Sequence, residues 1–155
     1  MTTKTIALSL GFLLAAGNLF ADSPLLGDWK LDEAQSKIAA GTGKNTHVQY
    51  NDLVGEGRIK VEVNGVDADG KKIDSEWKGK FDGKDYAVEG DSTVDMRAYT
   101  QVDERTLTMV NKKDGKVVST GRIAVSADGK TRTVTVNGKT PAGKKFKSTL
   151  VYHRD

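Results

Sequence analysis

The sequence predicts an all-β protein, a single up-and-down antiparallel β-barrel of eight to ten strands with one short helix after the first strand. Three observations carry this prediction. From Gly27 onward apolar and polar residues alternate with period two, six Asn-Gly or Asp-Gly pairs lie between residues 64 and 138, and the segment 32–41 contains three alanines and a lysine. The first two observations indicate a meander of short strands that closes on itself, and the third indicates the helix.

The alternation marks strands with one apolar and one polar face. In the segment 58–64 the side chains of Ile59, Val61 and Val63 share one face, and charged side chains occupy the other. Segments with this pattern give nine or ten expected strands, at about 27–32, 45–51, 58–64, 71–80, 84–89, 95–102, 105–112, 116–125, 131–137 and 145–153.

Turn pairs separate these segments, and some of them lie in a repeat. The pairs are Asn64-Gly65, Asp69-Gly70, Asp82-Gly83, Asp114-Gly115, Asp128-Gly129 and Asn137-Gly138, which favour tight turns with positive φ. The stretch VNGVDADGKK (63–72) returns as VNGKTPAGKK (136–145). Each copy joins two alternating segments, so we expect two hairpins of the same geometry.

Two ligand-binding interpretations of the repeat fit less well than the hairpin. A phosphate-binding loop needs a helix after its glycines, and no helical pattern follows either copy. A calcium loop built on Asp67 and Asp69 would have Lys71 at its third ligand position and no closing glutamate, and the second copy replaces both aspartates.

The segment DEAQSKIAAG, residues 32–41, is the helix candidate. Its alanine and lysine content favours one short helix after the first strand, and Gly41 would end it.

The first residues have the composition of a secretory signal peptide. Lys4 precedes an apolar run from Ile6 to Ala16, and small residues end at Ala21. The run is shorter than the roughly 20 residues of a membrane span, which disfavours the alternative of an uncleaved anchor. We therefore expect a signal peptide at 1–21 and one domain at 22–155. The mature chain, with no membrane span, would be exported to the periplasm or out of the cell.

Composition argues against nucleic acid and against disulfides. Removing the leader takes Lys4 and leaves 23 basic and 21 acidic residues, a net charge of +2. The lysines are scattered beside turns without interleaved aromatic residues, so we expect no nucleic-acid partner. The chain has no cysteine, so its core must hold the fold without cross-links.

No residues have the spacing of a catalytic or metal site. The histidines His47 and His153 have outer-face parity, and no serine lies in a Gly-x-Ser-x-Gly motif. We expect no catalytic residue, no metal ligand, no cofactor and no enzyme activity. An inward-facing His47 beside a carboxylate would be the observation that favours an enzyme.

The expected inner face mixes large apolar, small and hydroxyl side chains. Inward parity is assigned to Trp77, Phe81, Met96, Met109, Phe146 and Tyr152, and to the smaller Ser75, Gly79, Ser119, Gly121 and Ser148. A barrel of this many strands has more interior than its side chains always fill. The mixture favours a pocket for a partly apolar ligand over the alternative of a solid core.

The stretch LLGDWKLD, residues 25–32, resembles the Gly-x-Trp signature of the lipocalins and their calycin relatives, with Gly27 and Trp29 in the signature. The hairpin DGKVVSTGR (114–122) is similar to one in small exported bacterial lipocalin-like proteins without an assigned function. The chain length and the closing STLVYHRD resemble fatty-acid-binding proteins. The resemblance covers nearly all of 22–155 and implies a barrel that carries or senses a small lipophilic molecule.

The resemblance also implies roles for residues of the last strand. In the family an arginine near the last strand packs over the signature tryptophan, and Arg154 has that position relative to Trp29. Fatty-acid-binding proteins hold the ligand carboxylate with an arginine two residues before a tyrosine. Here Leu150 precedes Tyr152, so the arginine is missing, which favours a neutral or mostly apolar ligand. Two other arginines, 97 and 122, have outer-face parity and are not expected to replace it.

We expect non-catalytic binding or carriage of a small hydrophobic ligand in the lumen of a monomeric barrel. Trp77, Met109, Leu150 and Tyr152 are the expected wall of the site. The alternative is a filled barrel that serves as a structural or protein-interaction module of the cell envelope and takes no small ligand.

Overall fold

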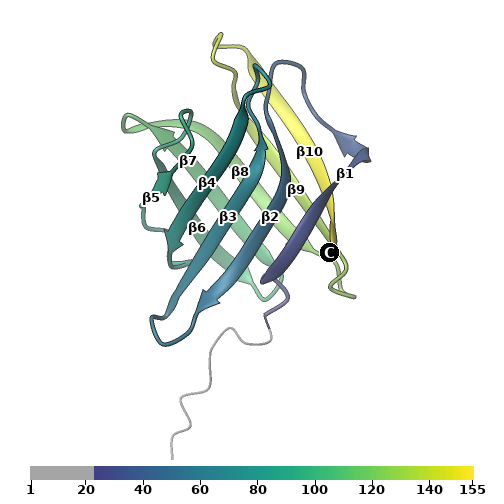
Figure 1. Cartoon of the computed structure of the whole chain (residues 1–155), viewed down its shortest axis with the longest axis vertical. Coiled ribbons are helices and arrows are strands. Elements are labelled where there is room, and N and C mark those ends of the chain that lie inside the picture. Colours follow the sequence, from purple (N-terminus) through teal and green to yellow (C-terminus); the bar gives the residue numbers. More distant parts are fainter. Residues whose placement is uncertain (1–22) are drawn as a thin grey trace, which may run out of the picture.

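The computed structural model describes residues 23–155 and has the form of a closed antiparallel barrel of ten strands (Figure 1). Strands adjacent in sequence are adjacent in the barrel, and β1 closes it against β10. The strands are β1 (Gly27–Lys37), β2 (Lys44–Leu53), β3 (Arg58–Val66), β4 (Lys72–Gly79), β5 (Tyr86–Glu89), β6 (Met96–Asp103), β7 (Thr106–Lys113), β8 (Lys116–Val125), β9 (Thr131–Lys139) and β10 (Lys145–Arg154). The predicted all-β fold class and up-and-down barrel are confirmed. The predicted signal peptide at 1–21 lies outside the described residues.

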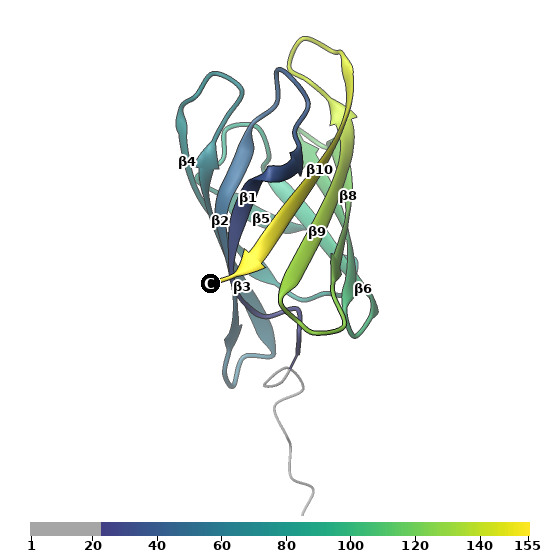
Figure 2. The ribbon, with the colours of Figure 1, turned by 90° about the vertical axis from the view of Figure 1, so that its right-hand side faces the viewer.

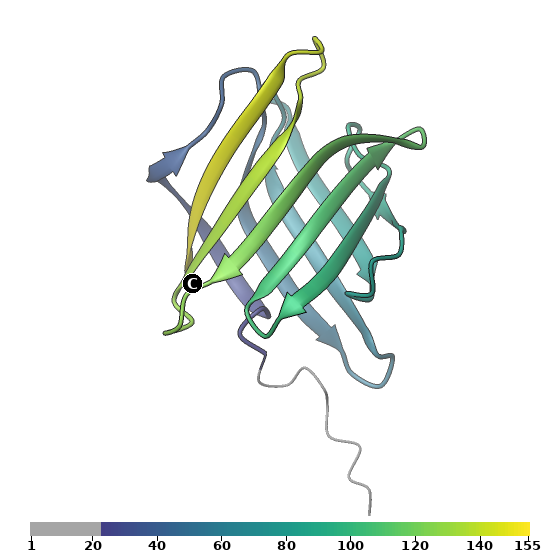
Figure 3. The same ribbon diagram turned by 180° about the vertical axis from the view of Figure 1, so that it is seen from behind.

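The two ends of the barrel differ in what they carry. The upper end in Figure 1 holds the turns that follow β1, β3, β5, β7 and β9. The lower end holds the start of β1, the end of β10 and the remaining turns. Figure 3 shows from behind how β6 to β10 run obliquely between the two ends.

The predicted helix over 32–41 is wrong. Its first half continues β1 as far as Lys37, and the rest forms the loop to β2, so residues 23–155 contain no helix. Helix propensity amounts to a few tenths of a kcal/mol for each residue, and strand pairing across a closing barrel outweighs it.

A bulge accounts for the unusual sequence at the end of β1. Asp32 pairs with Val151 of β10, but the next pair is Lys37 with Thr149, so the register shifts between them. Ser36 bridges the irregular stretch, because its Oγ donates to the carbonyl of Asp32 at 2.6 Å and accepts from the backbone N–H of Val151 at 2.9 Å. A side-chain hydroxyl thus takes the place of a ladder partner.

The two repeat copies form hairpins with the same loop geometry, as predicted. The backbone N–H of the first loop residue donates to the carbonyl of the fifth, from Asp67 to Lys71 at 2.9 Å and from Thr140 to Lys144 at 2.8 Å. The side chain of the first loop residue also accepts from the fifth N–H, through Asp67 Oδ1 at 2.9 Å and Thr140 Oγ1 at 3.2 Å. Aspartate and threonine therefore close equivalent turns.

The Asn-Gly pairs of the repeat do not form the turns that the sequence predicted. Gly65 and Gly138 lie inside β3 and β9. A Cβ on Gly65 would lie 2.3 Å from the carbonyl oxygen of Lys44, and one on Gly138 would lie 2.5 Å from that of Val118. These glycines let neighbouring strands approach closely.

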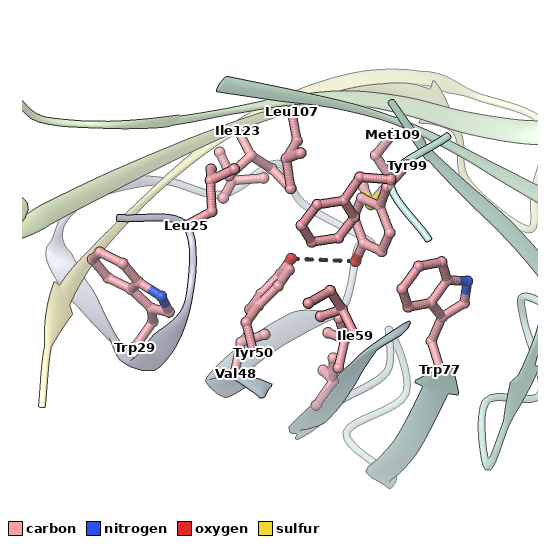
Figure 4. Packing of buried hydrophobic residues seen from close by; sticks show 14 of the residues in the cluster. Leu25, Trp29, Val48, Tyr50, Ile59, Trp77, Tyr99, Leu107, Met109 and Ile123 are labelled. Atoms are coloured by element: carbon pink, nitrogen blue, oxygen red, sulfur yellow. Dashed lines mark hydrogen bonds between the residues drawn. The ribbon is translucent and has the colours of Figure 1, made fainter. Parts of the chain in front are cut away.

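One cluster of buried hydrophobic side chains forms the core of the barrel, and Figure 4 shows part of it. The largest fully buried side chains are Trp29, Trp77, Tyr50, Tyr99, Ile59, Leu107, Ile123 and Val61. Each such side chain stabilises the fold by about 1.5–3 kcal/mol when it leaves water. The Trp77 ring meets the Tyr99 ring edge-on, with the centroids 4.8 Å apart.

The predicted parity is wrong for β6. Met96, expected inside, is 41% exposed, whereas Arg97, expected outside, is only 6% exposed. Tyr99 determines the direction of this strand, because it is buried in the aromatic core and residues two apart share a face. The guanidinium of Arg97 is accepted inside because it has hydrogen-bond partners there.

Candidate ligand site at the upper end of the barrel

The four predicted wall residues all lie in the buried core. Trp77, Met109, Leu150 and Tyr152 are at most 9% exposed and belong to one cluster. Trp77 Nε1 donates to the carbonyl of Arg97 at 2.9 Å. The four residues are packed among other side chains, and none of them lines the opening to solvent described below.

Trp29 and Arg154, which the resemblance paired, meet at the lower end of the barrel. The guanidinium of Arg154 lies 4.3 Å from the centre of the Trp29 ring. It also donates to the carbonyls of Pro24, Leu26 and Gly129 at 2.8–2.9 Å. Arg154 therefore joins three chain segments over the tryptophan and closes the base of the barrel.

A chain of polar side chains runs through the barrel interior. Arg132 Nη2 donates to Tyr50 Oη at 2.6 Å, and Tyr50 Oη donates to Tyr99 Oη at 3.2 Å (Figure 4 shows the tyrosine pair). Tyr99 Oη also accepts from Arg97 Nη1 at 3.4 Å. The two arginines are thus linked through two buried phenols.

The chain continues to the upper end. Arg97 Nε donates to Asn111 Oδ1 at 2.6 Å, and Asn111 Nδ2 donates to Ser119 Oγ at 2.9 Å. Arg97 and Asn111 are both 6% exposed. Ser119 is half-buried and lies where β8 starts, so the chain leads from the core to the mouth of the barrel.

Both interior arginines lack an acidic partner. Within residues 23–155 neither Arg97 nor Arg132 forms an ion pair. Arg132 is compensated by aromatic faces, with its guanidinium 4.3 Å from the Tyr50 ring centre and 5.7 Å from that of Tyr152. Its Nε and Nη1 atoms, and Nε1 of Trp29, are buried without a hydrogen-bond partner in the described chain. The interior therefore holds two guanidinium groups without an ion pair, although one carboxylate oxygen of Asp95 is buried as well.

The phenols of Tyr50 and Tyr152 stay neutral in this environment. Burial raises the pKa of Tyr50 well above its ordinary value, although the nearby Arg132 acts to lower it. Burial likewise raises the pKa of Tyr152 to about 12. Burial acts to lower the pKa of Arg97, but interactions with Tyr99 and Tyr50 and the charge of Asp91 outweigh it, and the pKa is raised. Near neutral pH the guanidinium is charged and no phenolate balances it.

A cleft opens to solvent beside residues of β8, β9 and β10. Figure 2 shows these three strands side by side. The cleft has a volume of about 610 Å³ and is lined by residues 117–120 of β8, 137–139 of β9 and 145–147 of β10. Phe146 and Val118 contribute apolar surface, and Ser119 contributes the end of the interior chain. Gly138 lies between them, because a Cβ there would come within 2.8 Å of Ser119 and 3.1 Å of the Phe146 ring.

The cleft and the polar chain differ from the predicted site. None of the four predicted wall residues lines the cleft. Arg97, Arg132 and Asn111 were not anticipated as interior residues. For Arg132 the sequence held a usable signal, since it shares parity with Val134 in the alternating segment 131–137. For Arg97 the usable signal was Tyr99, because residues two apart in a strand share a face and a tyrosine is often buried.

Other site classes find little support in the described part of the chain. Among residues 23–155 no three histidine, aspartate or glutamate side chains are grouped so that they could hold a metal ion. His153 is exposed and contacts Asp32 at 3.0 Å. His47 has the parity opposite to the buried Val48 and Tyr50. In the same residues no helix is long and apolar enough to cross a bilayer.

A closed antiparallel barrel of ten strands is consistent with a calycin or lipocalin-like fold. No protein-family model matches the chain, and no curated protein matches it.

Proposed function

We propose that this protein is an exported lipocalin-like barrel that binds a small, partly apolar molecule without transforming it. The signal-peptide composition of residues 1–21 supports export to the periplasm or out of the cell. The ligand enters at the upper end of the barrel, on the β8–β9–β10 side.

The cleft is the observation that carries this proposal. Its volume of about 610 Å³ lies within the roughly 300–1,000 Å³ range of small-molecule sites. Apolar Phe146 and Val118 lie beside hydroxyl and amide groups, which is the usual composition of such sites. Phe146 is half-buried, so its ring remains available to a ligand.

A binding titration with a neutral probe tests the proposal. N-phenyl-1-naphthylamine gains fluorescence in an apolar site, and energy transfer from tryptophan reports its proximity to the barrel. We expect saturable binding with one site per chain. Phe146→Ala should weaken binding about tenfold, because the ring supplies the main apolar contact.

The repeat offers a matched control for Phe146. Phe146 pairs with Gly138 in the second copy as Ile73 pairs with Gly65 in the first. Ile73 does not line the cleft, so Ile73→Ala should affect the hairpin in the same way and leave probe binding unchanged. Equal weakening by both variants would contradict a site at the cleft. If Met109→Leu weakened binding and Phe146→Ala did not, the ligand would lie on the predicted inner wall of Trp77, Met109, Leu150 and Tyr152.

The filled structural barrel remains the second candidate, because one observation favours it. The middle of the barrel is occupied by Trp77, Tyr50 and Tyr99, each at most 2% exposed. A well-folded protein that binds no probe saturably would establish this alternative, and the search would move to partners of the outer surface.

A further inference from the structure

The two copies of the repeat form the same hairpin but carry different charge. Residues 63–74 contain two lysines and three aspartates, whereas the equivalent residues 136–147 contain four lysines and no acid. Lys147 takes the place of Asp74, and Lys139 that of Val66. Because the first copy makes the same turn without these lysines, the geometry of the hairpin does not require them.

The two added lysines, Lys139 and Lys147, lie at the cleft beside Lys145, which has a lysine equivalent in the first copy. Lys139, Lys145 and Lys147 line the cleft, and no acidic residue does. Within residues 23–155 none of the three forms an ion pair. Three unpaired cations around one concave surface attract anions, since the field of like charges adds in a cleft.

The interior adds positive charge behind the same cleft. The buried Arg97 donates to Asn111, which donates to Ser119 in the lining. Arg97 forms no ion pair within residues 23–155, although the charge of Asp91 acts on it. Charge interactions in the low-dielectric interior are screened less than at the surface. Phe146 and Val118 line the cleft together with the three lysines and with Ser119, the end of the interior chain.

We propose that the ligand of the cleft is an amphipathic anion, an apolar body that carries one carboxylate, sulfonate or phosphate group. The apolar body packs on Phe146 and Val118, and the lysines Lys139, Lys145 and Lys147 attract the anionic group. This inference rests on the proposed function, because it names the ligand class of the same site. It replaces the neutral ligand that the sequence favoured.

Two matched probes test the charge separately from binding itself. The probe 1-anilinonaphthalene-8-sulfonate has the rings of N-phenyl-1-naphthylamine with a sulfonate added. At low ionic strength we expect the sulfonate to bind about tenfold more tightly than the neutral probe, and salt should reduce this preference. Decanoate should displace either probe at lower concentration than decanol does.

Lysine variants show whether the preference for the sulfonate probe arises at the cleft. Replacing Lys139, Lys145 and Lys147 by glutamine should weaken binding of the sulfonate about tenfold and leave the neutral probe unchanged. The control replaces the exposed Lys71, Lys72 and Lys80 by glutamine, which removes the same net charge from another part of the surface. Asn111→Asp supplies the acidic partner that Arg97 lacks, and it should also lower the preference for the sulfonate.

The outcomes separate the two proposals. If neither probe binds to the folded protein, the proposed function fails. If both bind equally and the lysine variant changes neither, the binding function stands and the anionic ligand class is overturned. Association with phosphatidylglycerol vesicles but not phosphatidylcholine vesicles, with no displacement of probe by monomeric decanoate, would also overturn it. The lysines would then recognise a lipid surface.

Discussion

Arg132 is a buried cation held by aromatic faces. Its guanidinium lies 4.3 Å from the Tyr50 ring centre and 5.8 Å from that of Trp29. Arg154 lies 4.3 Å from the same Trp29 ring. The indole is therefore contacted by two arginines, one inside the barrel and one at its base, and it links the interior to the closing strand.

Gly27 and Arg154 depend on each other at this base. Gly27 has a φ of +110°, and a Cβ there would lie 2.3 Å from Arg154 Nη1. Gly27→Ala should lower the free energy of unfolding by about 2 kcal/mol through backbone strain and displacement of Arg154. Arg154→Met should lower it by about 2 kcal/mol through loss of hydrogen bonds and of the contact with Trp29. In the double variant the free energy of unfolding should fall by about 1 kcal/mol less than the sum of the two single effects. Without the guanidinium, the methyl group added at Gly27 no longer meets Arg154.

Urea unfolding of the four proteins measures this coupling. Gly55→Ala is the control, since Gly55 also has positive φ, +83°, but has nothing within 4 Å of a Cβ. Its effect should add to that of Arg154→Met without coupling. Simple additivity for Gly27→Ala as well would show that the two residues act independently.

At the scale of strands, the sequence predicted regular pairing well and irregular pairing poorly. Period-two alternation and turn pairs depend only on local residues, so all ten strands could be placed. The bulge in β1 depends on the hydroxyl of Ser36, which bonds to Val151 of β10, far along the chain. The local sequence contains no sign of this contact, so it predicted a helix. The parity of β6 depends on a guanidinium satisfied by Asn111 of β7, which alternation cannot reveal.

The candidate site was harder to predict for the same reason. Phe146 and Ser119 were placed correctly on the inner face, but the cleft forms only where three strand ends meet. Sequence pattern gives the face of a residue and not its height in the barrel. The predicted wall residues consequently lie in the buried core and not at the cleft.

Ser36 gives a test of the bulge as an element. Ser36→Ala leaves the Val151 N–H and the Asp32 carbonyl without their hydroxyl partner, so the free energy of unfolding should fall by about 1–2 kcal/mol. Amide hydrogen exchange at Val151 should accelerate. Ser92→Ala, at an exposed turn position without a side-chain hydrogen bond, should change neither quantity. An unchanged Val151 exchange rate would mean that the hydroxyl does not hold β1 to β10.

At the scale of the whole molecule, the two ends of the barrel have separate tasks. The lower end is closed by Arg154 across three chain segments. The upper end carries small and polar inner residues, including Ser75, Ser119 and Ser148, with the cleft on one side. The interior chain of hydrogen bonds from Arg132 to Ser119 connects the core with the lining of the cleft.

The buried phenols should make the folded barrel sensitive to alkali. The pKa of Tyr152 is raised from 10.0 to about 12 by burial. The unfolded chain therefore loses this proton first, and the stabilising contribution, full below pH 10, is lost as the pH rises towards 12. By about pH 11 the loss from one such tyrosine should be near 1.4 kcal/mol.

Urea unfolding at about pH 9 and pH 11 tests this contribution. The free energy of unfolding should fall less for Tyr152→Phe than for the parent, because lysine titration is common to both. An equal fall in the two proteins would mean that Tyr152 ionises freely in the folded barrel and that water reaches the interior.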